Sequence, residues 1–453
     1  MQKHLSGGSR VVVLTTLAVA LIFSSHLANA QTFSNQRSVG GIAIDANGMM
    51  ENAQQDALGE LNKLRTEALQ ALPEDLSKSC KMRKVSLRGL ALAVENAKKT
   101  GQPIPDAAKY MAGLTRIEFV LIYPEQKDIV LAGPAEGWKV DANGNVVGSE
   151  TNQPIMLLDD LMVALRSTMD ARNGGISCSI DPTQQGLANM NRLMSQLRTI
   201  GNPEMTKAAI ENAMGPQTIT LDGVPATSHF ARVLVAADYR MKRIAMGFEP
   251  SPVAGIPCYL NMIKTASRSM STPRWWLEPN YEPILHSADK LAWCLQGASV
   301  KAMTEHDVAA ANGQIQHTGR ANSLAQKWAD SMTANYGDLA VASPVFGQLQ
   351  NCMDMAIVAA LVVAEDMKTR AGGCDISSLF SDEIAPVEEY FVPENVGTKS
   401  TLVKKRGGWV ISASGGVMLN SWGIMSNRKQ INGPTPLRTD SARPSDAKSF
   451  YWN

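Results

Sequence analysis

The first thirty residues constrain this chain more than any other segment, because they predict the compartment in which the rest must fold. Lys3 and Arg10 give the chain a basic start, and an apolar run extends from Val11 to Phe23. Ala28-Asn29-Ala30 then supplies the small-residue pattern at which secretory leaders are cleaved. This order predicts export to the periplasm or the extracellular space, with a mature chain that begins at Gln31.

The alternative is that residues 1–30 stay attached as an N-terminal anchor. Their apolar run is shorter than the roughly 20 residues that a membrane-spanning helix needs, which favours a cleaved signal peptide. No later segment reads as a membrane span. The most apolar one, Met353 to Ala364, contains Asp354 and is followed by two further acidic residues.

Composition and charge are those of an ordinary globular protein, with 44% hydrophobic and 19% charged residues. One core rarely grows beyond about 250–300 residues, so a chain of 453 residues is expected to form two lobes. The formal net charge is +1, and the leader contributes two positive charges and no acidic residue. Because the chain has no global basic field, nucleic acid is not an expected partner.

Six cysteines follow the leader, at wide and irregular spacings. An exported protein can form disulfides, but a chain of this length can build a core without them, so at most one or two bridges are expected. The remaining cysteines are expected to be small buried hydrophobes. The chain has no Cys-x-x-Cys motif, which argues against a tetrathiolate zinc site.

The expected fold class is α+β, because clusters of short strands alternate with helices in both halves. One meander is expected over residues 116–147 and a second over residues 275–304. We therefore predict an N-terminal lobe at residues 31–190 and an associated C-terminal lobe at 191–425. The latter ends in a β pair between residues 400 and 419. The polar, proline-containing segment 426–453 is predicted to be a flexible tail.

The clearest helix is expected from Ser228 to Met246, where apolar residues recur with a period near 3.6. Ser228 is a suitable N-cap and Gly247 a suitable C-terminal stop. The tetrapeptide Asp-Ala-Asn-Gly occurs at residues 45–48 and again at 141–144. Asn-Gly between alternating apolar residues is typical of a hairpin turn, and neither copy has the spacing of an EF-hand calcium loop.

Several blocks resemble the conserved motifs of a family of uncharacterised secreted planctomycete proteins, a domain of unknown function numbered 1598. The blocks are DIVLAGPAEGW (128–138), GGISCSIDPT (174–183), HFARVLVAADYRMKRIAMGFE (229–249), RWWLEPNYEPI (274–284) and VKAMTE (300–305). The resemblance runs from about Gly40 to Leu419. It implies export in a bacterium with an outer membrane. The family has no established activity, so the resemblance assigns neither an activity nor a catalytic residue to this chain.

Candidate catalytic residues are Asp238 and His229. Asp238 lies at the edge of the apolar stripe of the expected helix, so it needs a partner, for which a nearby arginine is the expectation. Such an ion pair would only lock the helix, whereas a general base in a cleft would serve a hydrolase. His229, in the first turn, is either a packing residue or a second catalytic group.

Candidate binding residues are Glu136 and Trp138, which follow a Gly-Pro turn, and Trp275 and Trp276, which could offer an aromatic platform. Strand alternation puts the two neighbouring tryptophans on opposite faces, so at most one can join a platform. Each of the four also has a plain packing interpretation.

Four histidines remain after the leader, and no two have the spacing of metal ligands on one helix, so no metal and no cofactor are expected. The histidines are His229, His286, His306 and His317. No recognised catalytic motif occurs. The sequence therefore favours a non-enzymatic binding or assembly module of the periplasm or cell envelope, whose partner would be an envelope protein or a glycan. The alternative is a hydrolase with a non-standard site near Asp238 and His229.

Overall fold

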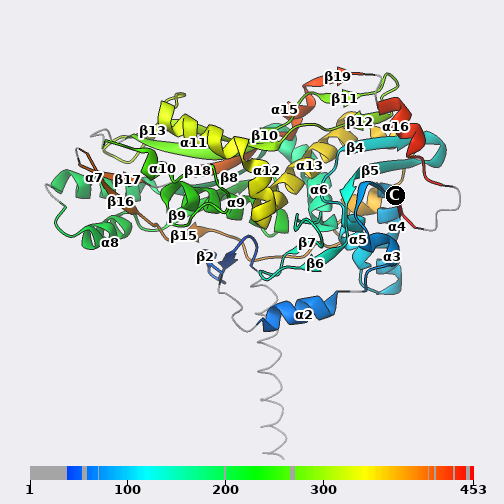
Figure 1. Cartoon of the computed structure of the whole chain (residues 1–453), viewed down its shortest axis with the longest axis horizontal. Helices are drawn as coiled ribbons and strands as arrows, with labels where there is room; N and C mark the ends of the chain where they lie inside the picture. The colour runs from blue at the N-terminus through cyan, green and yellow to red at the C-terminus, as the bar shows by residue number, and fades with distance from the viewer. Residues whose placement is uncertain are drawn as a thin grey trace, which may run out of the picture.

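Both helices and open sheets build the protein, which confirms the expected α+β class. The computed structural model describes residues 38–453 except for 54–58, 70, 198–199, 266–270, 407, 413–414, 432–433 and 445–448. The expected signal peptide lies outside the described residues. Figure 1 shows an elongated molecule with one large sheet toward each end and helices packed between and against them.

The larger sheet has nine strands. In spatial order they are β1 (Ile42–Ile44), β2 (Met49–Asn52), β15 (Asn395–Val396), β9 (Gln217–Asp222), β8 (Ile176–Pro182), β18 (Gly415–Leu419), β10 (Ser271–Asn280), β13 (Ser299–Ala309) and β14 (Ile315–His317). Neighbours are antiparallel except for β2 with β15 and β10 with β18. The sequence analysis does not predict β9, whose residues pair with β8 along its whole length.

The second sheet has seven strands. In spatial order they are β19 (Arg428–Gln430), β11 (Ile284–His286), β12 (Ala292–Cys294), β4 (Phe119–Tyr123), β5 (Asp128–Ala135), β3 (Cys80–Ser86) and β20 (Tyr451–Trp452). Two hairpins stand apart from both sheets, formed by β6 (Trp138–Val140) with β7 (Val146–Gly148) and by β16 (Thr401–Lys405) with β17 (Gly408–Ser412).

Both sheets take strands from both sides of residue 190, so the expected lobe boundary does not separate them. The segment expected to form a second meander is divided between the sheets. Its outer strands β10 and β13 pair in the nine-stranded sheet, whereas its inner strands β11 and β12 pair in the seven-stranded one. The chain leaves one sheet, contributes a hairpin to the other and returns.

Helices cover the sheets and fill the space between them. Those described are α2 (Glu60–Ala68), α3 (Glu74–Ser77), α4 (Leu87–Thr100), α5 (Asp106–Lys109), α6 (Leu158–Gly174), α7 (Gln184–Gln196), α8 (Pro203–Met214), α9 (His229–Met246), α10 (Tyr259–Met262), α11 (Ser323–Ala334), α12 (Tyr336–Ala342), α13 (Pro344–Ala364), α14 (Met367–Arg370), α15 (Ser421–Met425) and α16 (Pro434–Asp440). Helix α9 packs on β8, β18 and β10.

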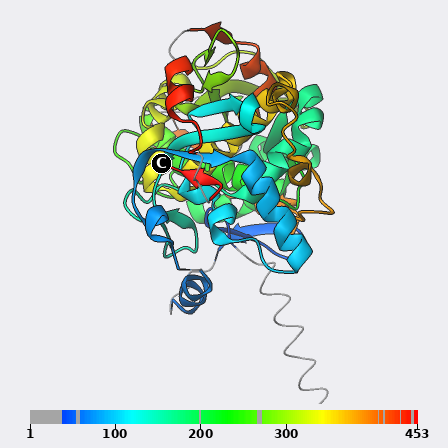
Figure 2. The same ribbon diagram turned by 90° about the vertical axis from the view of Figure 1, so that its right-hand side faces the viewer.

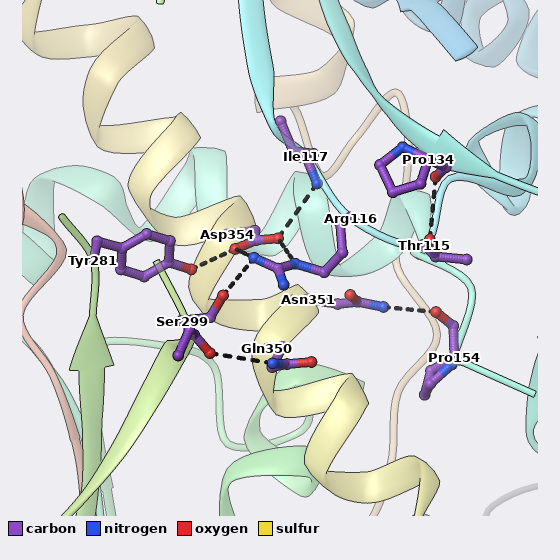
Figure 3. A network of polar contacts seen from close by, with 11 residues as sticks. Thr115, Arg116, Ile117, Pro134, Pro154, Tyr281, Ser299, Gln350, Asn351 and Asp354 are labelled. Atoms are coloured by element: carbon purple, nitrogen blue, oxygen red, sulfur yellow. Dashed lines mark hydrogen bonds and ion pairs between the residues drawn. The ribbon is translucent and has the colours of Figure 1, made fainter. Parts of the chain in front are cut away.

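Helix α13 is the central core helix. Among the described residues it is the one helix long and apolar enough to cross a membrane, and 94% of its most apolar stretch is buried inside the protein. Its Asp354 is fully buried and accepts hydrogen bonds from Arg116 (Nε to Oδ2, 2.6 Å) and from the Tyr281 hydroxyl. Arg116 precedes β4 and Tyr281 follows β10, so Asp354 ties both sheets to α13 (Figure 3).

The prediction that residues 426–453 form a flexible tail is wrong, because this segment contributes two strands. Strand β19 pairs with β11 and strand β20 pairs with β3, so this segment supplies both edges of the seven-stranded sheet (Figure 2). The polar composition of the segment does not reveal this pairing, because a strand at a sheet edge is held mainly by backbone hydrogen bonds. Tyr451 and Trp452 form such a strand against β3. The described residues of this segment are therefore part of the fold.

The two Asp-Ala-Asn-Gly segments are hairpin turns, as predicted. In each, one Asp oxygen accepts backbone N–H groups two and four residues further on, from Asn47 and Met49 and from Asn143 and Asn145. The acid therefore caps its own turn. All six cysteines are free thiols, and four of them are buried, namely Cys178, Cys294, Cys352 and Cys374.

Candidate functional site

Helix α9 carries both catalytic candidates, and its local sequence accounts for its ends. The Ser228 side chain accepts a hydrogen bond from the Ala231 N–H, and Gly247 adopts a left-handed φ of 74° that ends the helix. His229 and Asp238 are nine residues apart, which is about 13 Å along a helix axis. The structure therefore does not bring the two candidates together.

His229 is buried and forms an ion pair with Asp160. Its Nδ1 lies 2.9 Å from Asp160 Oδ2, and only 8% of the residue is exposed. Burial alone would lower the pKa of His229, but the charge and hydrogen bond of Asp160 outweigh burial, so the pKa is raised. The ring also lies near Tyr390, with centroids 6.1 Å apart. A histidine held in this way locks α9 to α6.

Asp238 is fully buried, and its partner is a lysine one helical turn further on, which corrects the expected arginine. Lys242 Nζ lies 2.7 Å from Asp238 Oδ2 and donates to the carbonyl of Ile180 at 3.3 Å. Burial raises the pKa of Asp238 to about 6, although the Lys242 charge opposes the rise. The pair joins α9 to β8 beneath the sheet.

A small hollow opens beside this ion pair and is called the α9 hollow here. Its volume is about 30 Å³, and its lining comes from β8, β9, α9 with the turn after it, and β15 with the residues after it: Ile180, Gln217, Tyr239, Lys242, Arg243, Met246, Phe248, Val396, Gly397 and Lys399. Gln217 is 92% buried, yet its Oε1 has no hydrogen-bond partner within the described chain. A buried acceptor without a partner is rare and points to a missing donor.

The rim of the α9 hollow is positively charged. Arg243 and Arg240 share one carboxylate, Glu249, at 3.0 and 2.8 Å. Lys399 is exposed and forms no ion pair with any described residue. Lys242 inside is paired with Asp238, so the excess positive charge comes from the two arginines that share Glu249 and from Lys399, and this excess suits an anion.

Glu136 and Trp138 hold a loop together. Glu136 is 2% exposed and accepts hydrogen bonds from the N–H groups of Glu150 and Thr151, at 2.7 and 3.1 Å, and from the Thr151 hydroxyl. Trp138 is buried against Tyr110, with ring centroids 5.4 Å apart. Neither side chain faces an open site.

Trp275 and Trp276 point to opposite faces of β10, as alternation predicts. Trp275 is 2% exposed and packs between Tyr259 and Trp328, with centroids at 4.8 and 5.1 Å. Trp276 is half-buried, donates from Nε1 to Glu278 at 2.6 Å and lies under the Arg274 guanidinium. The pair therefore forms no aromatic platform.

A further cluster was missed by the sequence analysis. Ligand atoms of Glu305, Asp307 and His317 lie within 4.8 Å of one another on the hairpin of β13 and β14. The signal was present, because Asn312-Gly313 is a hairpin turn of the kind recognised at residues 45–48. Continuing the register from that turn places Asp307 opposite His317.

Comparison with known proteins bears on one part of the chain. Residues 178–259 match the model of a family described as a protein of unknown function, DUF1598. This segment of the chain is therefore similar to that family. No curated protein and no solved structure matches the chain. The matched segment contains most of β8 and all of α7, α8, β9 and α9, and it supplies seven of the ten residues that line the α9 hollow.

Proposed function

We propose that this protein is an exported, non-enzymatic binding module of the periplasm or cell envelope, and that the α9 hollow takes one small anionic group of its ligand. The observation that carries the proposal is Gln217 Oε1, a buried acceptor with no partner in a hollow with a basic rim. The leader-like first thirty residues support the compartment.

The charges around the hollow select the ligand class. Lys399 and the arginine pair at Glu249 leave the rim positive, and Lys242 lies inside. Gln217 Oε1 accepts hydrogen bonds, so the anionic group is accompanied by an O–H or N–H donor. A carboxylate with a neighbouring hydroxyl satisfies both conditions.

The size of the hollow restricts what enters it. A buried water needs about 10–15 Å³ measured in this way, so 30 Å³ accommodates two or three heavy atoms. One carboxylate fits, and the rest of the ligand lies outside the rim. A free hydroxy acid and the acidic end of an envelope glycan or protein share this chemistry.

Binding is favoured over hydrolysis by the state of the two candidate catalytic groups. A general base must come within about 2.6–3.2 Å of the proton that it removes. Asp238 is fully buried behind Lys242, and His229 is engaged by Asp160 about 13 Å away along α9. Neither residue lines the hollow, so the geometry favours ligand binding over hydrolysis.

Calorimetric titration of the untagged chain with glycolate and with acetate tests the proposal. We expect glycolate to bind more tightly than acetate, because only glycolate has a hydroxyl that can donate a hydrogen bond to Gln217 Oε1. Gln217→Leu should abolish this preference, and Lys399→Ala should weaken both probes several-fold. Lys99→Ala, an exposed lysine on α4, is the matched control and should leave both affinities unchanged.

Equal affinities for the two probes in the wild type, or a loss of binding in the control, would contradict the proposed site. Binding of a glycan or envelope extract that survives both hollow variants would place the ligand elsewhere on the protein. Circular dichroism of each variant separates a lost contact from a lost fold.

A further inference from the structure

We propose that Glu305, Asp307 and His317 form a binding site for a divalent transition-metal ion on the β13–β14 hairpin. Their ligand atoms lie within 4.8 Å of one another, and His317 Nδ1 is 2.9 Å from Asp307 Oδ1. Two ligands of one ion, each at about 2.1 Å from it, are at most about 4.2 Å apart. Small side-chain rotations therefore close the site.

The hairpin fixes the three side chains on one face. Glu305 and Asp307 are two residues apart on β13, so both point to the same side of the sheet. Asp307 pairs directly with His317 across the strands, which puts the imidazole on that side as well. Gly313, with a φ of 83°, allows the tight turn that sets this register.

Charge compensation is missing at this cluster. Neither Glu305 nor Asp307 forms an ion pair with a lysine or arginine of the described chain, although Asp307 is only 8% exposed. The cation opposite Glu305 in register is Arg274, and its guanidinium lies over the Trp276 ring instead. Buried carboxylates are normally paired with a cation or bound to a metal. Within the described residues, His317 is the one basic side chain that contacts Asp307.

An ordinary ion pair lies on the same face of β10 and β13. Glu278 and Lys301 are opposite each other in the same two strands and form an ion pair at 3.5 Å. At this position a cross-strand lysine therefore neutralises the carboxylate. At Glu305 and Asp307 the sheet places a histidine beside two acids, which is the donor set of a metal site.

The donor set selects the class of ion. Imidazole favours Zn²⁺, Fe²⁺ and Cu²⁺ over Ca²⁺ and Mg²⁺, whereas two carboxylates also suit Mn²⁺. Three protein ligands leave at least one position for water, as in open zinc sites. The Irving–Williams order then predicts tighter binding of Zn²⁺ than of Mn²⁺. This proposal departs from the sequence-based expectation of no metal, which rested on the absence of histidines with metal-ligand spacing on one helix.

Titration of the untagged, EDTA-treated chain with ZnCl₂ and with MnCl₂ tests the inference. We expect one equivalent of Zn²⁺ per chain, with tighter binding than Mn²⁺. Loss of an outer-shell partner typically weakens metal binding about 10–100-fold, so His317→Ala and Asp307→Asn should each cost at least that. Electron paramagnetic resonance of bound Mn²⁺ should lose its protein-bound signal in the same variants.

Glu278→Gln and His286→Ala are the controls, a carboxylate of the same sheet face and a histidine of the other sheet. Both should bind Zn²⁺ like the wild type. No saturable binding by the wild type below millimolar Zn²⁺ would overturn the site. So would a stoichiometric ion that is retained in His317→Ala and lost in His286→Ala. Far-UV circular dichroism confirms that each variant is folded.

Discussion

Replacing Asp354 by asparagine should destabilise the whole protein, because this residue joins both sheets to the core helix. Its carboxylate accepts from Arg116 Nε at 2.6 Å, Arg116 Nη2 at 3.2 Å and the Ile117 N–H at 3.3 Å. It also accepts from the Tyr281 hydroxyl, whose pKa is raised well above its usual value by burial and by this carboxylate. Asparagine keeps the shape but loses the charge.

The magnitude follows from the burial of the two partners. Breaking a buried ion pair by removing one partner costs about 3–5 kcal/mol. The Arg116 side chain is 24% exposed, so water can solvate part of the orphaned guanidinium, and the lower end, about 3 kcal/mol, applies. The exposed Asp366→Asn, twelve residues further on, is the matched control and should change stability by less than about 0.5 kcal/mol.

Urea unfolding followed by tryptophan fluorescence and by far-UV circular dichroism measures the effect. The two transitions must coincide before a free energy of unfolding is extracted. Combining Asp354→Asn with Arg116→Met should cost less than the sum of the single changes, because the two residues contact each other. A stability for Asp354→Asn within 1 kcal/mol of the wild type, or strict additivity in the double variant, would refute the reasoning.

Three other predictions concern α9 and the leader. Leu234→Ala should cost about 2–5 kcal/mol, since Leu234 is fully buried, whereas Leu64→Ala, at a residue 62% exposed, should cost little in the same urea assay. The folded-state pKa of Asp238, about 6, exceeds the unfolded value of about 3.9, so this group binds more protons in the folded state, and its contribution to stability falls as pH rises from 4 to 6. Asp238→Asn lacks this loss, and its unfolding free energy relative to the wild type should rise by up to about 3 kcal/mol over that range; a decrease would mean that Lys242 lowers the pKa instead. N-terminal sequencing of the protein from its native host should begin at Gln31, and a chain that still starts at Met1 in the membrane fraction would contradict cleavage.

Local features of the fold could be predicted from the sequence, because their causes are local. Helix α9 begins after Ser228 and ends at Gly247 as expected, since a serine cap and a left-handed glycine act within one turn. The Asp-Ala-Asn-Gly turns were predicted for the same reason. The opposite faces of Trp275 and Trp276 followed from the two-residue period of a strand.

The arrangement of the sheets and the α9 hollow could not be predicted, because they depend on contacts between distant segments. Arg116 and Asp354 are 238 residues apart, and no periodicity in either segment indicates that they meet. Gln217 and Lys399 reach one hollow only because the short strand β15 pairs with β9. The cluster of Glu305, Asp307 and His317 is different, since the turn at Asn312-Gly313 contained enough local information to predict that these residues meet.

The pairing of β20 with β3 has a consequence for how the protein is made. Residues 450–453 reach back to the start of the seven-stranded sheet, where the Ser86 N–H donates to the Phe450 carbonyl at 2.8 Å and the buried Arg83 donates to Asn453 at 2.8 Å. During synthesis those residues emerge some 370 positions after β3. Until then the β3 edge of that sheet is open and Arg83 Nε lacks its acceptor, although the other Arg83 nitrogens can already donate to the carbonyls of Ala112, Asp75 and Lys78. The complete seven-stranded sheet therefore forms only after the last residues have been made.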